Sequence, residues 1–450
     1  MRAVACLAVL LGVTSAWAAD VVFTEPTCRQ VELVASTPAL DPTNGPITEK
    51  RGRAFCTAGD FSEGSGLTGP VGQRLKALLY NGGPNKLESV RIAYYTIASH
   101  ELSDYVCEQY KLSPFKLSIA TQNSTGVAGV GKPVADTLAA CMGGDLEIKR
   151  VGCGIYDAGA SCPKSDDVIN TFHAKVIDIQ RRDGMHDIVA SSGNLNRGMI
   201  ANFEDWLFFP GLTRYSKLLA QHQCMLSAFD TLTTDPSKPK SGQAYRDCLT
   251  AKNALGAEDG ITSLYLPEAA NTALQRIEQN FAAAESIVIA TQDFRGLRFL
   301  KALEGAAARG AKIEFIVDDD WYYARPEIGL PGLTANAQEI EGVRALFLKY
   351  PQAISMRYLE TNHEQEVNKT GKNVLHHKFI FFKLPTGNRR LFAGAANLTD
   401  GAFYGNAENV YWIESNQILA GYETYIERLR TRSVAESAMP AYPAPAKPQP

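Results

Sequence analysis

The chain has 450 residues, 45 of them Lys or Arg and 48 of them Asp or Glu, so its formal net charge at pH 7 is −3. This length exceeds what a single hydrophobic core normally supports, and two domains of ordinary size fit it. A nonspecific nuclease usually gathers positive charge along its phosphate track, and the lack of an evident Lys/Arg run in this sequence argues against that class.

The first residues predict export from the cytosol. Arg2 precedes an apolar run at residues 3–13, and Ala16-Trp17-Ala18 has the small-x-small form of a signal-peptidase site. We therefore expect a signal peptide at 1–18 and a secreted or periplasmic mature chain that begins near Ala19. A membrane anchor is the alternative, but the run is short for a bilayer span and no other stretch approaches that length.

Cysteine usage agrees with export. The cysteines that follow the signal form an even set in the first half of the chain: Cys28, Cys56, Cys107, Cys141, Cys153, Cys162, Cys224 and Cys248. An even set in an oxidising compartment predicts disulfides. We expect Cys153 to pair with Cys162, which closes a short loop, and the other connectivities stay open. A zinc site is the alternative, but the sequence has no Cys-x-x-Cys.

In chain order, both halves alternate strand-like and helix-like segments. The first half has strands at 89–95, 115–119 and 146–151, and helices at 98–112 and 134–142. The second half has strands at 286–290, 312–317 and 354–359, and helices at 296–309 and 336–350. Strands separated by helices of this length predict mixed or parallel sheets in an α/β fold, and the parallel between the halves predicts an internal duplication.

These patterns divide the chain into domains. We expect two similar mixed-sheet α/β domains, the first at 19–250 with the disulfides and the second at 251–432. A polar, Pro-containing segment at about 230–260 is expected to be a surface connection. Residues 433–450 are expected to be an extended Pro/Ala-rich tail.

One motif occurs twice. Phe172-His173-Ala174-Lys175 and Leu375-His376-His377-Lys378 both contain His-x-Lys, and in each copy an Asn follows the first His by 21 residues and an Asn-x-Glu comes next. The recurring residues are His173, Lys175, Asn194 and Glu204 in the first copy and His376, Lys378, Asn397 and Glu408 in the second. A lone His-x-Lys is usually a half-exposed polar pair, but four residue types that recur in order at nearly equal offsets predict a two-part active site.

The residue types suit phosphoryl transfer. Residues i and i+2 of a strand point to one face, so each half would present an imidazole and an ammonium side by side. Such a reaction needs a nucleophile, a proton donor for the leaving oxygen, and donors around the phosphate oxygens. By the same register, His377 should point away from His376.

This repeated motif resembles that of the phospholipase D superfamily, whose members join two such half-sites into one phosphodiester-cleaving centre. The resemblance implies that His173 attacks phosphorus to form a phosphohistidine and that His376 acts as general acid and base. It also implies that the Lys and Asn pairs hold phosphate oxygens and that the Glu of each half fixes the tautomer of the His in its own half. No metal or other cofactor is needed in this scheme.

The match has departures. Gln180 and Lys383 stand where the family usually has Asp, which questions the subfamily more than the activity. The second copy has Ala395 where the first has Ser192, so we expect unequal hydrogen bonding to substrate. Glu204 follows its Asn by 10 residues, against 11 in the second copy, and is the less secure assignment.

Apolar and acidic segments bear on the substrate. By repeat alignment, residues 206–209 are expected to be a core strand, which leaves Trp321 to Tyr323 as a substrate-facing cluster. The run Asp318 to Asp320 could bind a cation, but we expect solvated residues at a strand end. The sequence thus favours a secreted phosphodiesterase acting on phospholipid at a membrane surface, with nucleic acid as the alternative substrate. A third possibility, a noncatalytic binding protein of this fold, is disfavoured because both His-x-Lys pairs are intact.

Overall fold

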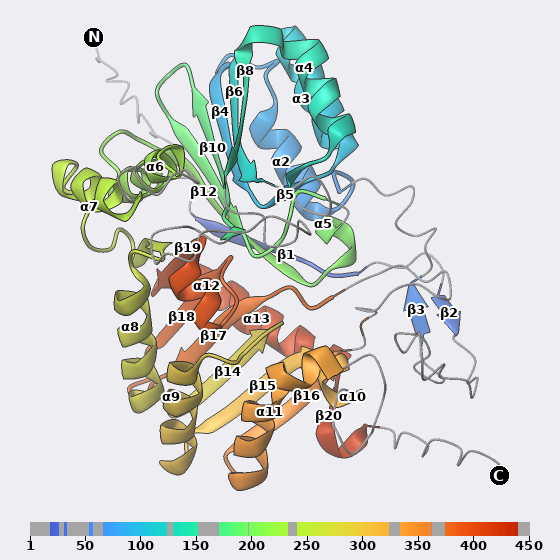
Figure 1. Cartoon of the computed structure of the whole chain (residues 1–450), viewed down its shortest axis with the longest axis vertical. Coiled ribbons are helices and arrows are strands. Elements are labelled where there is room, and N and C mark those ends of the chain that lie inside the picture. The colour runs from blue at the N-terminus through green and yellow to red at the C-terminus, as the bar shows by residue number, and fades with distance from the viewer. Residues whose placement is uncertain are drawn as a thin grey trace, which may run out of the picture.

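The computed structural model describes residues 19–26, 31–33, 54–56, 66–123, 129–151, 171–196, 198–232, 241–323, 334–359, 361 and 374–439. The expected signal peptide and the expected Cys153–Cys162 pair lie outside these residues. Figure 1 shows two α/β domains, one coloured blue to green and the other yellow to red. None of the described helices combines the length and the apolar character of a membrane span.

The first domain is built on a seven-stranded mixed sheet. Its strands, in spatial order, are β1 (Asp20–Thr24), β12 (Glu204–Leu212), β11 (His186–Ser191), β10 (Lys175–Arg181), β4 (Leu87–Tyr94), β6 (Lys116–Gln122) and β8 (Leu146–Val151). The last three are parallel to one another, and the pairs from β1 to β4 are antiparallel. The sheet is therefore mixed, as the sequence predicts.

The second domain repeats this order. Its sheet follows β13 (Ile261–Leu266), β19 (Asn406–Ile413), β18 (Arg389–Gly394), β17 (Lys378–Lys383), β14 (Ser286–Thr291), β15 (Lys312–Asp318), β16 (Ile354–Leu359) and β20 (Ser433–Ala435). Strands β14, β15 and β16 are parallel, like β4, β6 and β8, and the next pairs are antiparallel. Equal order and equal direction are what an internal duplication predicts.

Helices cover the outer faces of the two sheets. They are α2 (Pro70–Leu79), α3 (His100–Leu112) and α4 (Lys132–Met142) in the first domain, and α8 (Ala270–Ala283), α9 (Leu297–Ala308) and α11 (Thr334–Lys349) in the second. The amphipathic pattern explains their packing: α3 buries Leu102, Val106 and Cys107, and its N-terminus is capped by Ser99, which accepts from the N–H of Leu102. Each outer face thus has its own hydrophobic core.

A third core lies between the domains. It joins buried side chains of both inner sheet faces, such as Phe172 and Leu207 from the first domain and Phe379 and Tyr411 from the second. Helices α6 (Lys217–Asp230) and α13 (Asn416–Arg432) also contribute to it. Because this core is shared, the two sheets hold each other in place where the repeated motifs meet. Residues 206–209 are fully buried in β12, which confirms the expected core strand.

Two disulfides link neighbouring helices of the first domain. Cys107 in α3 bonds to Cys141 in α4, and Cys224 in α6 bonds to Cys248 in α7 (Ser241–Ala251). Residues 241–251, within the expected surface connection at 230–260, form a helix of mostly exposed or half-buried residues that the second disulfide joins to α6. Tyr245 of α7 is buried, which fixes that helix against the central core.

The folded chain continues beyond the expected boundary at residue 432. Strand β20 pairs with β16, and the 3-10 helix η2 (Glu436–Ala438) follows it. Met439 packs into the core of the second domain. Residues 433–439 therefore belong to the domain rather than to an extended tail, because β20 completes the edge of its sheet.

Candidate active site

The two motif segments cross between the domains. The short strand β9 (Thr171–Phe172) of the first copy runs parallel to β19 of the second domain, and the N–H of His173 donates to the carbonyl of Ala407 at 2.9 Å. In the other direction, Leu375 bridges Phe203 of the first domain, whose carbonyl accepts the N–H of His376 at 2.9 Å. Each His is therefore held by the backbone that leads to the other half's Glu.

Each motif is also anchored to its own sheet by a side chain at the end of a strand. Gln122, the last residue of β6, accepts the N–H of Phe172 at 2.5 Å, and Asp318, the last residue of β15, accepts the N–H of Leu375 at 2.8 Å. The next residue, Asp319, is fully buried and accepts the N–H and the hydroxyl of Thr361. Asp318 and Asp319 are thus structural acceptors, which corrects the expectation of solvated residues.

The catalytic candidates pair crosswise. His173 Nδ1 lies 2.8 Å from Glu408 Oε2, and His376 Nδ1 lies 3.5 Å from Glu204 Oε1. This corrects the expectation that each Glu serves the His of its own half. The reason is topological: the residue before each Glu pairs with the opposite motif segment, Phe203 with Leu375 and Ala407 with Phe172, so the side chain of the Glu meets the opposite imidazole. An Asn two residues earlier orients each carboxylate, Asn202 at 3.0 Å from Glu204 and Asn406 at 3.0 Å from Glu408.

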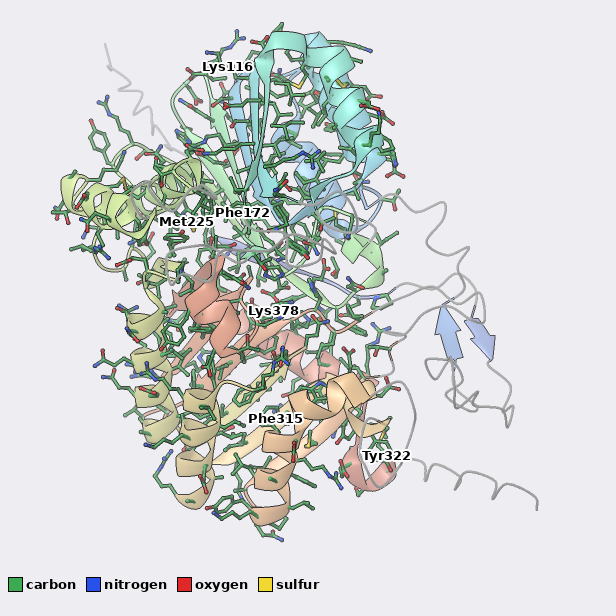
Figure 2. The ribbon with its side chains drawn as sticks, viewed as in Figure 1. Lys116, Phe172, Met225, Phe315, Tyr322 and Lys378 are labelled. Atoms are coloured by element: carbon green, nitrogen blue, oxygen red, sulfur yellow. A yellow bond between two sulfur atoms is a disulfide. The ribbon has the colours of Figure 1, made fainter. Side chains whose placement is uncertain are left out.

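Each lysine lies beside the His of its own motif. Lys175 is the first residue of β10 and His173 lies just before the strand, yet Lys175 Nζ is 3.0 Å from His173 Nε2 and 2.9 Å from its carbonyl. Lys378 begins β17 in the same way, and its Nζ donates to the carbonyl of His376 at 2.7 Å. Both lysines are buried. Figure 2 shows Lys378 and Phe172, the neighbour of His173, toward the junction of the two domains.

The two site asparagines lie in matching loops, Asn194 after β11 and Asn397 after β18. In both, Oδ1 is buried and has no hydrogen-bond partner within the part of the chain that the structure describes. Gly193 allows the loop that carries Asn194 to approach Glu204 closely, because a Cβ at Gly193 would lie 1.8 Å from Glu204 Oε2. Ser192 is fully buried and accepts the N–H of Asp205, so it serves the protein interior, contrary to the expectation that it contacts substrate.

Burial dominates the electrostatics of this site. It lowers the pKa of His173 to about 4, although Glu408 opposes the shift, and it lowers the pKa of His376 well below its ordinary value, helped by Lys378 and Lys175. Burial lowers the pKa of Lys378 to about 8 and that of Lys175 well below its ordinary value, and it raises the pKa of Glu204 to about 7. Such displaced values, gathered in one place, are typical of a functional site.

One acidic residue near the site was missed from sequence. Asp293 follows β14, and its backbone carbonyl accepts the N–H of Leu398, the neighbour of Asn397. Burial raises its pKa to about 6, while Arg295 and Lys378 oppose that shift. The signal was weak because a single Asp after a strand usually ends the strand without further function.

The tryptophan cluster expected to face substrate is mostly interior. Trp321 in α10 (Asp320–Tyr323) is buried against Phe315, and its Nε1 donates to the carbonyl of Gln292. Tyr322 packs edge-on against Tyr358. His377, in contrast, points away from His376 as the strand register predicts, and its ring is buried on Asp205.

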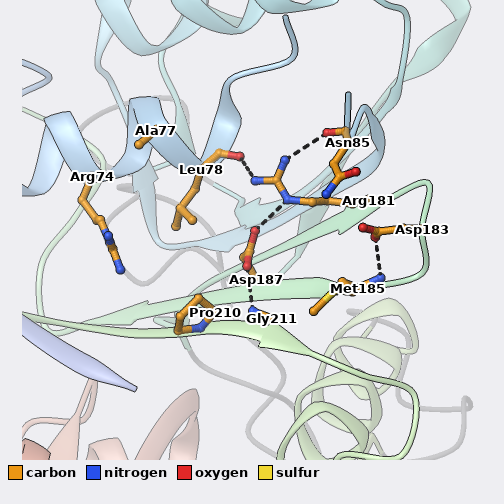
Figure 3. Close-up of a pocket in the computed structure, with 10 residues that line it drawn as sticks. All are labelled: Arg74, Ala77, Leu78, Asn85, Arg181, Asp183, Met185, Asp187, Pro210 and Gly211. Carbon is orange, nitrogen blue, oxygen red and sulfur yellow. Dashed lines mark hydrogen bonds and ion pairs between the residues drawn. The ribbon is translucent and has the colours of Figure 1, made fainter. Parts of the chain in front are cut away.

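A separate pocket of about 280 Å³ lies at the far end of the first sheet. Figure 3 shows Arg181 there, bonded to Asp187 and to the carbonyls of Leu78 and Asn85. Arg181 ends the strand that Lys175 begins, so the pocket is about 20 Å from the motif histidines. It contains none of the candidate catalytic residues. No group of His, Cys, Asp and Glu within the described ranges could hold a metal ion.

Comparisons with known proteins agree with this geometry. Residues 277–430 match a family model described as "Cardiolipin synthase, PLD-like domain". No curated protein matches the sequence. Among solved structures, phosphatidylserine synthase of Haemophilus influenzae Rd KW20 is similar at 15% identity, with 83% of this chain and 86% of that chain covered and a TM-score of 0.56.

Two further solved structures are more distant. The yeast tyrosyl-DNA phosphodiesterase is 13% identical over 75% of this chain and 85% of its own, with a TM-score of 0.43. NucT from Helicobacter pylori is 20% identical over 39% of this chain and 97% of its own, with a TM-score of 0.30. Of these three likenesses, that to the phosphatidylserine synthase shows a shared fold.

Proposed function

We propose that the chain is a secreted phosphodiesterase of the phospholipase D superfamily that hydrolyses phospholipid headgroups through a phosphohistidine. The match of residues 277–430 to the PLD-like domain model and the fold shared with the phosphatidylserine synthase support this proposal. The observation that carries this proposal is the crossed pairing of His173 with Glu408 and of His376 with Glu204. This pairing supports one reaction centre that uses two imidazoles, one from each domain. Neither half alone has both a nucleophile and a proton donor.

The geometry favours His173 as the nucleophile. Ionised Glu408 can only accept, so it holds the proton of His173 on Nδ1 and leaves the lone pair of Nε2 for attack. Nε2 attacks phosphorus while the bond from phosphorus to the headgroup oxygen breaks. Lys175 lies next to Nε2 and would follow the phosphate oxygens as negative charge gathers there.

His376 completes the cycle as acid and then base. Protonated on its reacting nitrogen, it gives that proton to the leaving headgroup alcohol and is then neutral. A water that donates its proton to His376 next attacks the phosphohistidine, which releases phosphatidic acid and restores both histidines. Lys378 and the amides of Asn194 and Asn397 would hold the phosphate oxygens throughout.

Two features support lipid over nucleic acid. The chain is slightly acidic overall, whereas nonspecific nucleic-acid binding depends on phosphate neutralisation by many cations. In addition, Leu297 is 76% exposed, and its N–H donates to Asp400, the first residue of helix α12 (Asp400–Gly405), which follows the loop that carries Asn397. An exposed apolar side chain beside the site loop suits an amphiphilic substrate better than a nucleic-acid strand.

A parallel assay tests the proposal. Purified mature protein is incubated with phosphatidylcholine vesicles, with single-stranded DNA and with double-stranded DNA, and a double variant, His173→Ala with His376→Ala, is the matched control. We expect release of headgroup from the vesicles and none from the variant. Turnover of DNA alone would replace the lipid proposal with the nuclease alternative, and no turnover of any phosphodiester would favour a noncatalytic binding protein.

A further inference from the structure

The residue that follows each site Glu reaches across the domain interface, but it does so differently in the two halves. Asn409 follows Glu408, and its Oδ1 accepts the backbone N–H of Lys175 at 2.7 Å. Asp205 follows Glu204, and its Oδ1 instead lies 2.8 Å from ring Nδ1 of His377. The middle residue of His-x-Lys is thus hydrogen-bonded across the interface only in the second copy, since the first copy has Ala174 there.

The hydrogen bond between Asp205 and His377 is part of a buried network. Tyr422 donates to Asp205 Oδ2 at 2.8 Å, and the hydroxyl of Tyr425 lies 3.0 Å from His377 Nε2. A carboxylate only accepts, so His377 carries its proton on Nδ1 and accepts from Tyr425 on Nε2. Asp205 and His377 are at most 1% exposed, so the pair is protected from solvent.

The network coincides with a difference between the two Glu–His contacts. On the Asn409 side, His173 Nδ1 is hydrogen-bonded to Glu408 at 2.8 Å. On the Asp205 side, His376 Nδ1 stays 3.5 Å from Glu204 and has no hydrogen-bond partner in the described part of the chain. Asp205 directly follows Glu204 in the chain, and His377 directly follows His376. The contact between Asp205 and His377 therefore constrains how closely Glu204 and His376 can approach each other.

We propose that Asp205 and His377 are positioning residues that hold His376 out of hydrogen-bond contact with Glu204 and so make the two catalytic histidines unequal. This inference rests on the proposed function. An imidazolium without a carboxylate partner gives up its proton more readily, which suits the acid that protonates the leaving group. His173, with its carboxylate, keeps a fixed tautomer, which suits the nucleophile.

The charged groups around both rings agree with this division. His376 faces Lys378, Lys175, His173 and His377, which all disfavour its protonated form, and Glu204 is the carboxylate nearest to it. Around His377 lie Asp205 and Glu25, which favour a proton, and Lys378, which disfavours one. The hydroxyl of Tyr425 donates to Nε2 and so favours the neutral ring. Burial outweighs these charges and lowers the pKa of His377, so the network contains a neutral imidazole.

The natural repeat supplies the test. In the double variant Asp205→Asn with His377→Ala, the half-site around His376 has the same residue types as the half-site around His173, where Asn409 and Ala174 occupy the equivalent positions. We expect His376 to gain the hydrogen bond to Glu204, so its pKa rises by about one pH unit. The alkaline limb of the kcat profile, which reports loss of the acid's proton, should move to higher pH by the same amount, and kcat should fall by about tenfold.

Two measurements distinguish an effect on the position of His376 from an effect on the stability of the domain interface alone. The kcat profile is measured on a soluble chromogenic phosphodiester, and the ring pKa of His376 is measured by NMR on protein with selectively labelled histidine. Tyr422→Phe is the control, because it removes a donor to Asp205 but leaves the contact with His377, and it should lower stability without moving the alkaline limb. The NMR titration needs no turnover, so a protein inactive on every phosphodiester would end the proposed function and still test this inference.

An unchanged pKa of His376 in the double variant would overturn the proposal, as would equal alkaline limbs in wild type and variant. If the double variant does not fold, Asp205→Asn alone takes its place under the same two criteria. A loss of stability with an unmoved limb in that variant means that the network only supports the interface.

Discussion

The two half-sites contain the same four residue types but hold them differently. In the half around His173, the imidazole is hydrogen-bonded to Glu408 at 2.8 Å and lies 3.0 Å from the ammonium of Lys175. In the half around His376, the nearest carboxylate is 3.5 Å away, and Lys378 bonds to the backbone instead of to the ring. Two half-sites with the same motif residues can therefore differ through the neighbours of those residues.

The two glutamates show the same principle. Glu204 accepts from Trp206 Nε1 at 3.3 Å as well as from Asn202, whereas Val410 stands at the place of Trp206 beside Glu408. Glu204 is therefore held mainly by its own domain, and Glu408 is directed at the opposite His. Burial raises the pKa of Glu204 to about 7, so this carboxylate is partly neutral near the pH at which the enzyme is expected to act.

The largest expected effect comes from the histidines themselves. Replacement of either His173 or His376 by Ala should lower turnover by about 1,000-fold or more, because one change removes the nucleophile and the other the proton donor. Trapping the covalent intermediate distinguishes the roles of the two histidines: covalent phosphate should form on His376→Ala protein and be absent from His173→Ala protein. Acid-quenched protein with labelled substrate gives the measurement, and the reverse pattern would exchange the two roles.

Much of this arrangement could be predicted from the sequence, because an internal duplication repeats the same spacing between motif residues in both halves of the chain. The 21-residue offset from His to Asn recurs, and it identifies His173, His376 and their partners without any knowledge of packing. The alternation of strands and helices likewise predicts two similar sheets. Both signals are local along the chain, and this is why they survive without a structure.

The crossed pairing could not be predicted in this way. Local sequence links Glu204 to His173, which is nearer along the chain, but Phe203, the residue before Glu204, pairs with Leu375 of the second motif, and Glu204 therefore lies against His376. The interior roles of Asp318 and Trp321 were also missed. A strand-end carboxylate and an aromatic run have the same appearance in sequence whether they face solvent or fold back into a core.

A second test of the comparison uses the pH dependence of stability. Burial places the pKa of His173 at about 4 in the folded protein, below its ordinary 6.5, so the unfolded chain binds more protons and this His costs stability as pH falls from 6.5 to 4. Glu204 acts in the opposite sense: its folded pKa of about 7 exceeds the ordinary 4.5, so it costs stability as pH rises from 4.5 to 7. Each effect is of the order of 3 kcal/mol.

The measurement is urea unfolding of three proteins across this pH range. Relative to wild type, His173→Asn should gain stability as the pH is lowered, and Glu204→Gln should gain stability as the pH is raised. Slopes of the same sign in both variants would mean that the two half-sites are not electrostatically opposed, and the comparison would lose its basis.

A third test compares the two carboxylates in catalysis. Glu408→Gln should lower kcat by about 100-fold, because the amide can donate to His173 and so permits the wrong tautomer at the attacking nitrogen. Glu204→Gln should lower kcat by about tenfold, because His376 is not hydrogen-bonded to Glu204 in the resting site. Both are isosteric changes, so thermal unfolding serves as a check that each variant is folded. Equal losses would show that the half-sites tighten to the same geometry when substrate binds.

The smallest expected effect is that of chelation, and it tests whether the two halves together supply all the positive charge that the reaction needs. In the proposed mechanism, Lys175 and Lys378 surround the phosphate together with the amides of Asn194 and Asn397. Asp318 already accepts the N–H of Leu375 and Asp319 that of Thr361, which occupies oxygens that a cation would use. We therefore expect exhaustive treatment with EDTA to leave kcat unchanged. A soluble chromogenic phosphodiester is the required substrate, because divalent ions also alter vesicle surfaces and the adsorption of protein to them. Complete loss of turnover, restored by one specific metal, would contradict the expectation and would mean that the paired His-x-Lys motifs are not sufficient for the chemical step.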